Sequence, residues 1–231
     1  MGAPDLDRAA VSRMRRIELW WPWDTPEPSD GQIDDLVAEL RRRRLSLVAV
    51  NYWGGDTSAG QRGVLHEQPL SLRHLDAMSR LAEATGADRF NLLVGRGGRQ
   101  LSPGQLDNIA TVSQVAEERG QGTVLIEPSA GVDDYPVVTV AEAMGIVHSV
   151  PNTALLADLW HLSQTDDVPG WLGDLADAGT GAGADALPAH VQIADDPGRG
   201  APGTGELPLE EWVGALRAAG YAGDVAGEWM W

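Results

Sequence analysis

Short apolar runs alternate with segments that carry helix start and stop signals along most of this chain. Seven of these runs have the length and composition of buried strands. They are Arg15–Trp21, Ser46–Val50, Asp88–Val94, Thr123–Ile126, Ala154–Ala157, His190–Ala194 and Asp224–Glu228. Because strand and helix alternate throughout, the pattern predicts a parallel sheet with helical crossovers.

The segments between the runs contain helix boundaries. In a capping box, a hydroxyl and a side chain three residues later each bond the other's backbone N–H. Three pairs have this spacing: Ser29 with Gln32, Ser102 with Gln105, and Thr139 with Glu142. Three glycines stand where helices are expected to end: Gly86, Gly120 and Gly220. We therefore expect an α/β fold of the (β/α) TIM-type barrel kind, with residues 1–231 as a single domain.

The number of strands departs from a closed barrel, which has eight. An eighth strand would have to precede Arg15, where Asp5–Met14 predicts a helix instead. We therefore expect the barrel to lack its first strand.

Charge and composition exclude several classes of function. The chain has 34 acidic and 17 basic residues, a formal net charge of -17, so it repels phosphate backbones and nucleic acid is not an expected partner. All basic residues are arginine, which removes lysine chemistry, and the absence of cysteine removes thiolate nucleophiles and thiolate metal sites. No apolar run approaches the roughly 18 residues of a membrane span, so we expect a soluble, cytoplasmic protein without membrane contact.

Four of the apolar runs end in a side chain with a free oxygen: Glu127, Asp158, Gln192 and Glu228. The ends of parallel barrel strands open onto one mouth, so these separated positions can converge. Taken singly, each acidic residue is more often a solvated loop residue or a helix cap. Their recurrence at four strands favours a shared site, and an all-oxygen set suits Mg²⁺ or Mn²⁺ better than zinc or copper.

Further polar and aromatic residues are candidates for holding a substrate. His161 follows Asp158 by three residues and can serve as a hydrogen-bonding group or a further ligand. Arg62 can bind a carboxylate through its planar guanidinium, or only organise its loop by salt bridges. Several of the nine tryptophans, Trp53 among them, fall near strand ends, where they either line a pocket or pack in the core.

Six segments together resemble one known family. They are IELWWPWD (17–24), NYWGGDTSAGQRGVL (51–65), IEP (126–128), DLWH (158–161), HVQIADDPGRGAPGTGE (190–206) and GYAGDVAGEW (220–229). The chain resembles the hydroxypyruvate isomerase family, a group of xylose isomerase-like TIM barrels within the sugar isomerase and epimerase superfamily. The resemblance extends from about Ile17 to Trp229, and the segment at 190–206 is its most specific part.

The resemblance implies roles for individual residues. It implies metal ligands at Glu127, Asp158, Gln192 and Glu228, with the two glutamates as the acid/base pair. His161 and Arg199 match positions that hold substrate oxygens. The implied reaction is isomerisation or epimerisation of a small α-hydroxy carbonyl compound through an enediolate, with one glutamate removing the proton and the other returning it.

The chain also departs from the family pattern. The first strand has no counterpart, and the chain stops three residues after Glu228, where relatives continue into a last helix. An open seam with unpaired edges is then expected between the first and last strands present. We expect a homo-oligomer to cover it. The loop after Pro128 also differs from the family's, so the substrate can differ from hydroxypyruvate.

Three other functions compete with the isomerase. A lyase or dehydratase of the same superfamily would use the same metal and base to expel a β-hydroxyl. A barrel that has lost catalysis would act as a binding or scaffold subunit, although it would have no reason to retain a full metal set. A nuclease with the same barrel would need more histidine ligands and a cationic surface, which this chain lacks.

Overall fold

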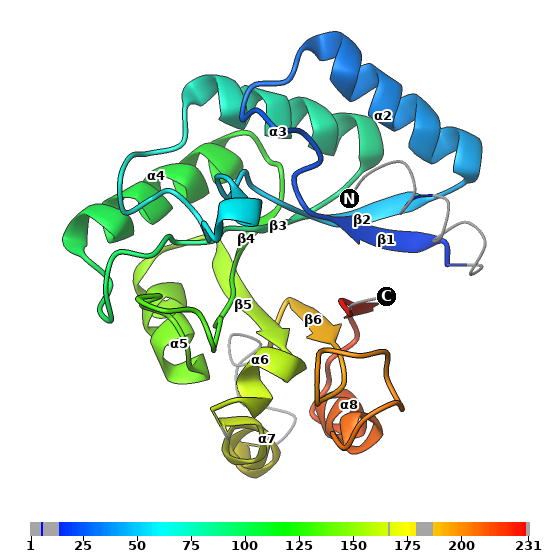
Figure 1. Ribbon diagram of the computed structural model, residues 1–231, viewed down its shortest axis with the longest axis vertical. Helices are drawn as coiled ribbons and strands as arrows, with labels where there is room; N and C mark the ends of the chain where they lie inside the picture. Colours follow the sequence, from blue (N-terminus) through cyan, green and yellow to red (C-terminus); the bar gives the residue numbers. More distant parts are fainter. Residues whose placement is uncertain (1–5, 7–13, 166, 179–186, 230–231) are drawn as a thin grey trace.

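The structure, a computed structural model, describes residues 6, 14–165, 167–178 and 187–229. Seven parallel strands form one curved sheet whose spatial order is the order of the sequence (Figure 1). The strands are β1 (Arg16–Leu19), β2 (Ser46–Asn51), β3 (Arg89–Asn91), β4 (Thr123–Ile126), β5 (Thr153–Asp158), β6 (His190–Ile193) and β7 (Val225–Gly227). Each lies within, or within one residue of, a run predicted from the sequence, so the (β/α) barrel architecture is confirmed.

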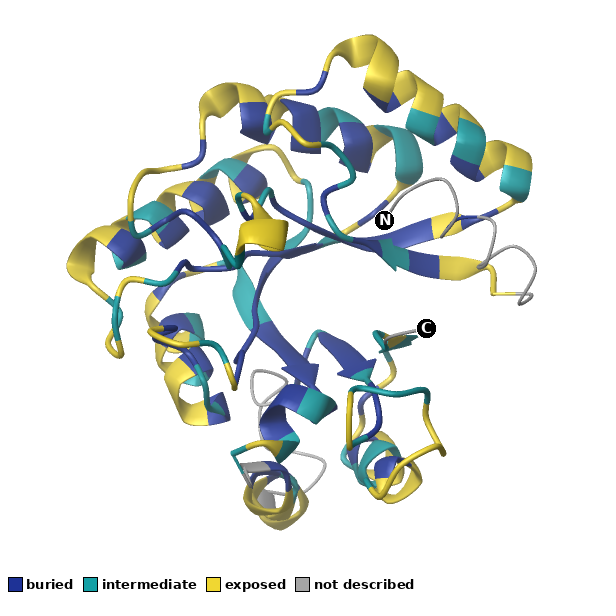
Figure 2. Ribbon diagram, viewed as in Figure 1, coloured by how far each residue is buried: buried dark blue, intermediate teal, exposed yellow. Residues whose placement is uncertain are grey.

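Helices connect successive strands and lie on the convex side of the sheet (Figure 1). Their buried faces turn toward the strands and their exposed faces turn to solvent, as Figure 2 shows. The connections contain α2 (Asp30–Arg43), η1 (Thr57–Ala59), α3 (Leu72–Thr85), α4 (Pro103–Glu118), α5 (Val140–Ser149), α6 (Leu159–Ser163), α7 (Asp167–Ala178) and α8 (Leu209–Ala218).

The predicted helix boundaries are present. α2, α4 and α5 each begin at a capping box formed by the expected pair of residues. Gly86 ends α3 in the left-handed conformation, with φ of 76°. Each of these boundaries is fixed by contacts within a few residues of the helix end. The local sequence therefore sets where these helices begin and end.

The core lies between the sheet and the helices. In β4, Val124, Leu125 and Ile126 are all fully buried. A parallel strand covered on both faces has no solvent-facing side, which is why its sequence is continuously apolar instead of alternating. Polar residues buried within such strands, for example Asn51 and Asn91, therefore stand out as exceptions.

The sheet does not close through its backbone within the described residues. β1 and β7 are its two edges, and no strand pairing joins them. Side chains bridge this seam between β1 and β7 instead. They come from alternate positions of β1 and from the residue that follows it. The links are Arg16 with Asp224, Glu18 with His190 and Gln192, and Trp20 with Glu228.

Two predictions are left open by the structure. The helix predicted at Asp5–Met14 lies almost entirely outside the described residues. The prediction that residues 1–231 form one domain stays a prediction. Among the described residues, no helix is both long enough and apolar enough to cross a membrane.

Candidate active site

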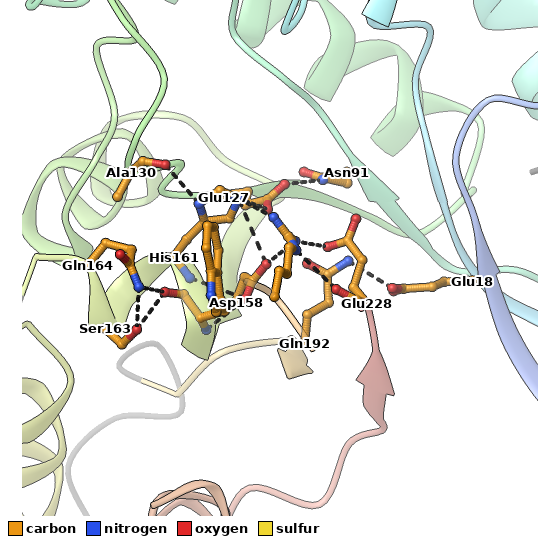
Figure 3. A network of polar contacts seen from close by, with 12 residues as sticks. Glu18, Asn91, Glu127, Ala130, Asp158, His161, Ser163, Gln164, Gln192 and Glu228 are labelled. Carbon is orange, nitrogen blue, oxygen red and sulfur yellow. Dashed lines mark hydrogen bonds and ion pairs between the residues drawn. The ribbon is translucent and has the colours of Figure 1, made fainter. Parts of the chain in front are cut away.

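The carboxyl ends of β4 to β7 bring the predicted ligands to one place (Figure 3). Glu127 directly follows β4, Asp158 is the last residue of β5, and Glu228 directly follows β7. Gln192 lies in β6, where it is in register with Asp158 on the neighbouring strand. The architecture thus supplies the convergence that the sequence pattern predicts.

Glu127 lies deep in the site. Its side chain is 5% exposed, and Oε2 accepts a 2.6 Å hydrogen bond from Nδ2 of Asn91 on β3. Burial, together with the nearby charge of Asp158, raises the pKa of the Glu127 carboxyl to about 7. A carboxyl with such a pKa can both take and release a proton near neutral pH.

Asp158 has two tasks. Its Oδ1 accepts bonds from the backbone N–H groups of Trp160 and His161 and so caps the short helix α6. Its Oδ2 accepts a 2.6 Å bond from Arg199. Asp158 is therefore a helix cap, one of the two roles that its sequence context allows. Its second oxygen, Oδ2, still faces the site.

The guanidinium of Arg199 lies at the centre of the cluster. One nitrogen, Nη2, donates to both Asp158 Oδ2 and Glu228 Oε2 at 2.6 Å. Nη1 donates to Nε2 of His161 at 2.9 Å. Burial opposes the positive charge of Arg199, but Asp158 and Glu228 more than offset this and raise its pKa. Arg199 is thus a fixed cation in contact with two of the predicted metal ligands.

Hydrogen bonds to both ring nitrogens fix the orientation of His161. Its Nδ1 donates to the backbone oxygen of Ala130 at 3.0 Å, which leaves Nε2 as an acceptor for Arg199. Burial lowers the pKa of His161, so its ring is neutral at neutral pH. Nε2 lies 3.9 Å from carboxylate oxygens of both Glu127 and Asp158.

The geometry of Glu228 depends on the first strand. Oε1 accepts a 2.8 Å bond from the indole Nε1 of Trp20, which follows β1. Burial and the nearby Glu127 raise the pKa of Glu228 well above its usual range. The side chain is therefore held between Trp20 and Arg199, at the seam of the sheet.

The donor set fits a divalent cation. Ligand atoms of Glu127, Asp158 and His161 all lie within 4.8 Å of one another. Gln192 adds a carbonyl oxygen, Oε1, that is buried and has no hydrogen-bond partner. A buried oxygen without a donor is costly unless something else contacts it. The clustered carboxylates and this oxygen together match the preference of Mg²⁺ or Mn²⁺ for oxygen ligands.

Two other residues, Trp53 and Arg62, are also predicted to bind the substrate. Trp53 lines a cavity of about 560 Å³ together with Trp20, whose indole reaches Glu228. Arg62 donates to the backbone oxygens of Thr57 and Gln61. Substrate binding by Trp53 and Arg62 stays a prediction.

Sequence reasoning missed two residues of the site, Glu18 and Asn91, and considered Trp20 only as one of the tryptophans that line a pocket or pack in the core. Glu18 and Asn91 each have a signal in the chain, because they are polar residues inside apolar runs. A polar residue in a buried strand requires a partner. The sequence does not say which partner, since the residues that Glu18 contacts are 172 and 174 positions away.

Comparisons with known proteins agree with this geometry. The sequence profile of the xylose isomerase-like TIM barrel family matches residues 7–229. A putative hydroxypyruvate isomerase of Streptomyces coelicolor is 33% identical, with 98% of this chain and 85% of that protein covered. Hydroxypyruvate isomerase of Escherichia coli is 26% identical, with 97% and 86% covered.

Among solved structures, one described as AP endonuclease, family 2, from Brucella melitensis superposes with a TM-score of 0.77. It is 26% identical, and the match covers 97% of this chain and 86% of that one. The family resemblance seen in the sequence motifs is therefore confirmed over nearly the whole length. The chain belongs to the hydroxypyruvate isomerase family of xylose isomerase-like TIM barrels.

Proposed function

We propose that this protein is a metal-dependent isomerase or epimerase of a small α-hydroxy carbonyl compound of the hydroxypyruvate type. The observation that carries the proposal is the pair Glu127 and Glu228. Glu127 is buried and the side chain of Glu228 is 19% exposed, both carboxyls have raised pKa values, and they come from non-adjacent strands on either side of Asp158 and Arg199. Two such carboxyls are what proton transfer between neighbouring carbons requires.

The metal would be held by Glu127, Asp158, Gln192 and Glu228, with His161 close enough to contribute. A bound Mg²⁺ or Mn²⁺ supplies Lewis-acid polarisation of a carbonyl oxygen. The residues fit this ion because their oxygens converge and because Gln192 Oε1 is left without a donor. Arg199 supplies positive charge to the same carboxylates in the structure.

The two glutamates divide the proton transfers. One removes the proton from the hydroxyl-bearing carbon, and the electron pair of that C–H bond forms the enediolate double bond while the carbonyl oxygen takes negative charge. The other returns a proton to the former carbonyl carbon, while the hydroxyl proton passes to the former carbonyl oxygen, and this gives the isomer. Return of the proton to the opposite face of the carbon that lost it gives the epimer. Arg199 is placed to donate to the oxygens that carry this charge, and His161 helps to hold its guanidinium by accepting from Nη1.

The surroundings support a small molecule as the substrate. Carboxyls of Glu127, Asp158 and Glu228 surround the site, and the formal charge of -17 disfavours polyanions. We place the protein in the cytoplasm, consistent with a composition that contains no cysteine. Nucleic acid and membranes are not part of the proposal.

The proposal is tested by proton NMR of hydroxypyruvate in D₂O. Protein stripped of metal with EDTA and reloaded with Mg²⁺ should convert the ketone to its aldehyde isomer and incorporate deuterium, while the stripped protein should not. A panel of other small hydroxy ketones distinguishes isomer, epimer and dehydration products. Absence of turnover across the panel by fully loaded protein, or equal turnover by stripped protein, would overturn the proposal.

A further inference from the structure

We infer that Glu18 is a positioning residue that holds the Gln192 amide with its oxygen toward the metal site and makes that site depend on closure of the seam. The inference rests on the proposed function, because it concerns the same metal site. Glu18 reaches toward this site from β1, as Figure 3 shows. No predicted site residue comes from this strand.

The orientation of Gln192 follows from what a carboxylate can do. Oε1 of Glu18 accepts a 2.9 Å bond from Nε2 of Gln192. An ionised carboxylate offers only acceptors, so the opposite orientation of the amide would place two oxygens against each other. Glu18 therefore selects the orientation in which Gln192 Oε1 faces away from it, and this buried oxygen is the one without a donor.

Glu18 is itself held in place. Its Oε2 accepts a 2.7 Å bond from Nε2 of His190, a fully buried residue two positions before Gln192. Residues two apart on a strand share a face, so β6 presents both donors to the two oxygens of a single carboxylate. With both oxygens engaged, the carboxylate cannot rotate without breaking a bond to β6.

The negative charge of Glu18 has a second effect. A carboxylate that accepts from the NH₂ group of an amide polarises that amide and increases the electron density on its oxygen. Partners of this kind fix the direction of a metal ligand and raise its basicity, and losing them typically costs about 10- to 100-fold in metal affinity. Glu18 thus strengthens Gln192 as a ligand without contacting the ion.

The same contact links the site to the seam. Glu18 lies on β1 and Gln192 on β6, and β7 forms the other edge of the sheet. Trp20, two residues beyond Glu18, donates to Glu228 just after β7. Two of the four predicted ligands are therefore oriented by side chains from the opposite edge, so movement of β1 away from β7 would misalign both.

The experiment measures Mn²⁺ affinity by electron paramagnetic resonance, which reports binding without turnover. Glu18→Leu should weaken Mn²⁺ binding about 10- to 100-fold. Glu18→Gln should cause a smaller loss, because its amide oxygen still accepts from Gln192 but the charge is gone. Asp224→Asn removes the charge from another link across the seam, the one to Arg16, and leaves the links of Glu18 and Trp20 in place, so it should leave Mn²⁺ affinity unchanged.

A double-mutant cycle separates positioning from a general structural effect. If Glu18 acts through Gln192, then Glu18→Leu should change Mn²⁺ affinity little in a Gln192→Ala background. Should Glu18→Leu fail to fold by circular dichroism, the same cycle with Glu18→Gln decides. Undiminished affinity in both Glu18 variants, or equal losses with and without Gln192, would overturn the inference while leaving the proposed function intact. Absence of Mn²⁺ binding by the wild type would overturn both.

Discussion

The reactive character of Glu127 arises from its immediate surroundings. A carboxyl in water would be ionised and weakly basic at neutral pH, but burial and Asp158 move its pKa to about 7. Asn91 donates to one oxygen at 2.6 Å, so the carboxyl that we propose to exchange protons has a defined direction. Asn91 thus fixes the position of the Glu127 carboxyl, whereas burial and Asp158 raise its basicity.

Replacing Glu127 by Gln should abolish turnover and leave the fold intact. Asn91 can still donate to the amide oxygen of the new side chain, but the group can no longer take a proton. General acid/base transfer contributes roughly 100- to 10,000-fold, so kcat should fall by that order. The exposed Glu117→Gln is the matched control, and its activity should equal the wild type. Undiminished activity in Glu127→Gln would remove this residue from the mechanism.

Arg199 balances the carboxylates of the site when no metal is bound. Arg199→Gln should therefore lower the free energy of unfolding of the metal-free protein by a few kcal/mol, because buried charges lose their partner. Mn²⁺ should then raise the melting temperature of this variant more than that of the wild type.

The matched control for Arg199 is Arg119→Gln, which breaks an exposed ion pair with Asp76. Such surface pairs contribute at most about 1 kcal/mol, so the control should unfold nearly as the wild type does. If metal-free Arg199→Gln were as stable as this control, the charge-balancing role would be excluded.

The sequence patterns identified only some of the residues of the site. Residues with a side-chain oxygen at the end of a strand can be recognised, because the length and the apolar composition of a strand can be read from the sequence. The central place of Arg199 is not, because it lies in a loop with a left-handed backbone, φ of 57°, and no periodic pattern reports where such a loop folds. Nor can a sequence say which way the Gln192 amide points, since that depends on Glu18.

At the scale of elements, buried polar residues tie helices to strand ends. His74 on α3 is fully buried and donates from Nδ1 to the backbone oxygen of Pro26. Its Nε2 accepts from the backbone N–H of Trp53, beyond β2. The bond to Pro26 can also be made by the protonated ring, but the bond from Trp53 requires a neutral Nε2, so His74 joins the loop after β2 to α3 only while it is unprotonated. His74 therefore has a structural role.

Stability should fall in acid partly through His74. Burial lowers its folded-state pKa to about 4, whereas the unfolded value is near 6.5. Between these pH values the unfolded chain binds a proton that the folded chain does not, so the contribution is complete above pH 6.5 and is lost as pH falls toward 4. The loss amounts to roughly 3 kcal/mol.

Urea unfolding at a series of pH values, compared with His74→Gln, checks this expectation. The variant cannot titrate at this position, so the difference in stability between the two proteins should shrink as pH falls from 6.5 to 4. A difference that stays constant over this range would show that His74 is not the titrating group. Comparison of the two proteins removes the contributions of the site carboxyls, which they share.

The whole molecule is a barrel whose seam is bridged by side chains. In a sheet closed by its backbone, the ladder of hydrogen bonds alone would hold the mouth together. Here Arg16, Glu18 and Trp20 reach across instead, and two of them end on predicted ligands. The side chains that bridge the seam therefore also position two of the predicted ligands.

Oligomerisation over the seam remains a prediction at this scale. The two edges of the sheet carry backbone groups without strand partners, and a second copy of the chain would cover them. Light scattering coupled to size exclusion should report a mass above the 24.6 kDa of one chain. A monomer at all concentrations would show that side chains alone are sufficient to close the barrel.

The most direct test of the account is the anomalous scattering of manganese in a crystal soaked with Mn²⁺. The account predicts one Mn²⁺ bound by oxygens of Glu127, Asp158, Gln192 and Glu228, with the guanidinium of Arg199 displaced from the two carboxylates. Absence of manganese from this position in saturated crystals, or an ion that leaves these side chains uncoordinated, would contradict it.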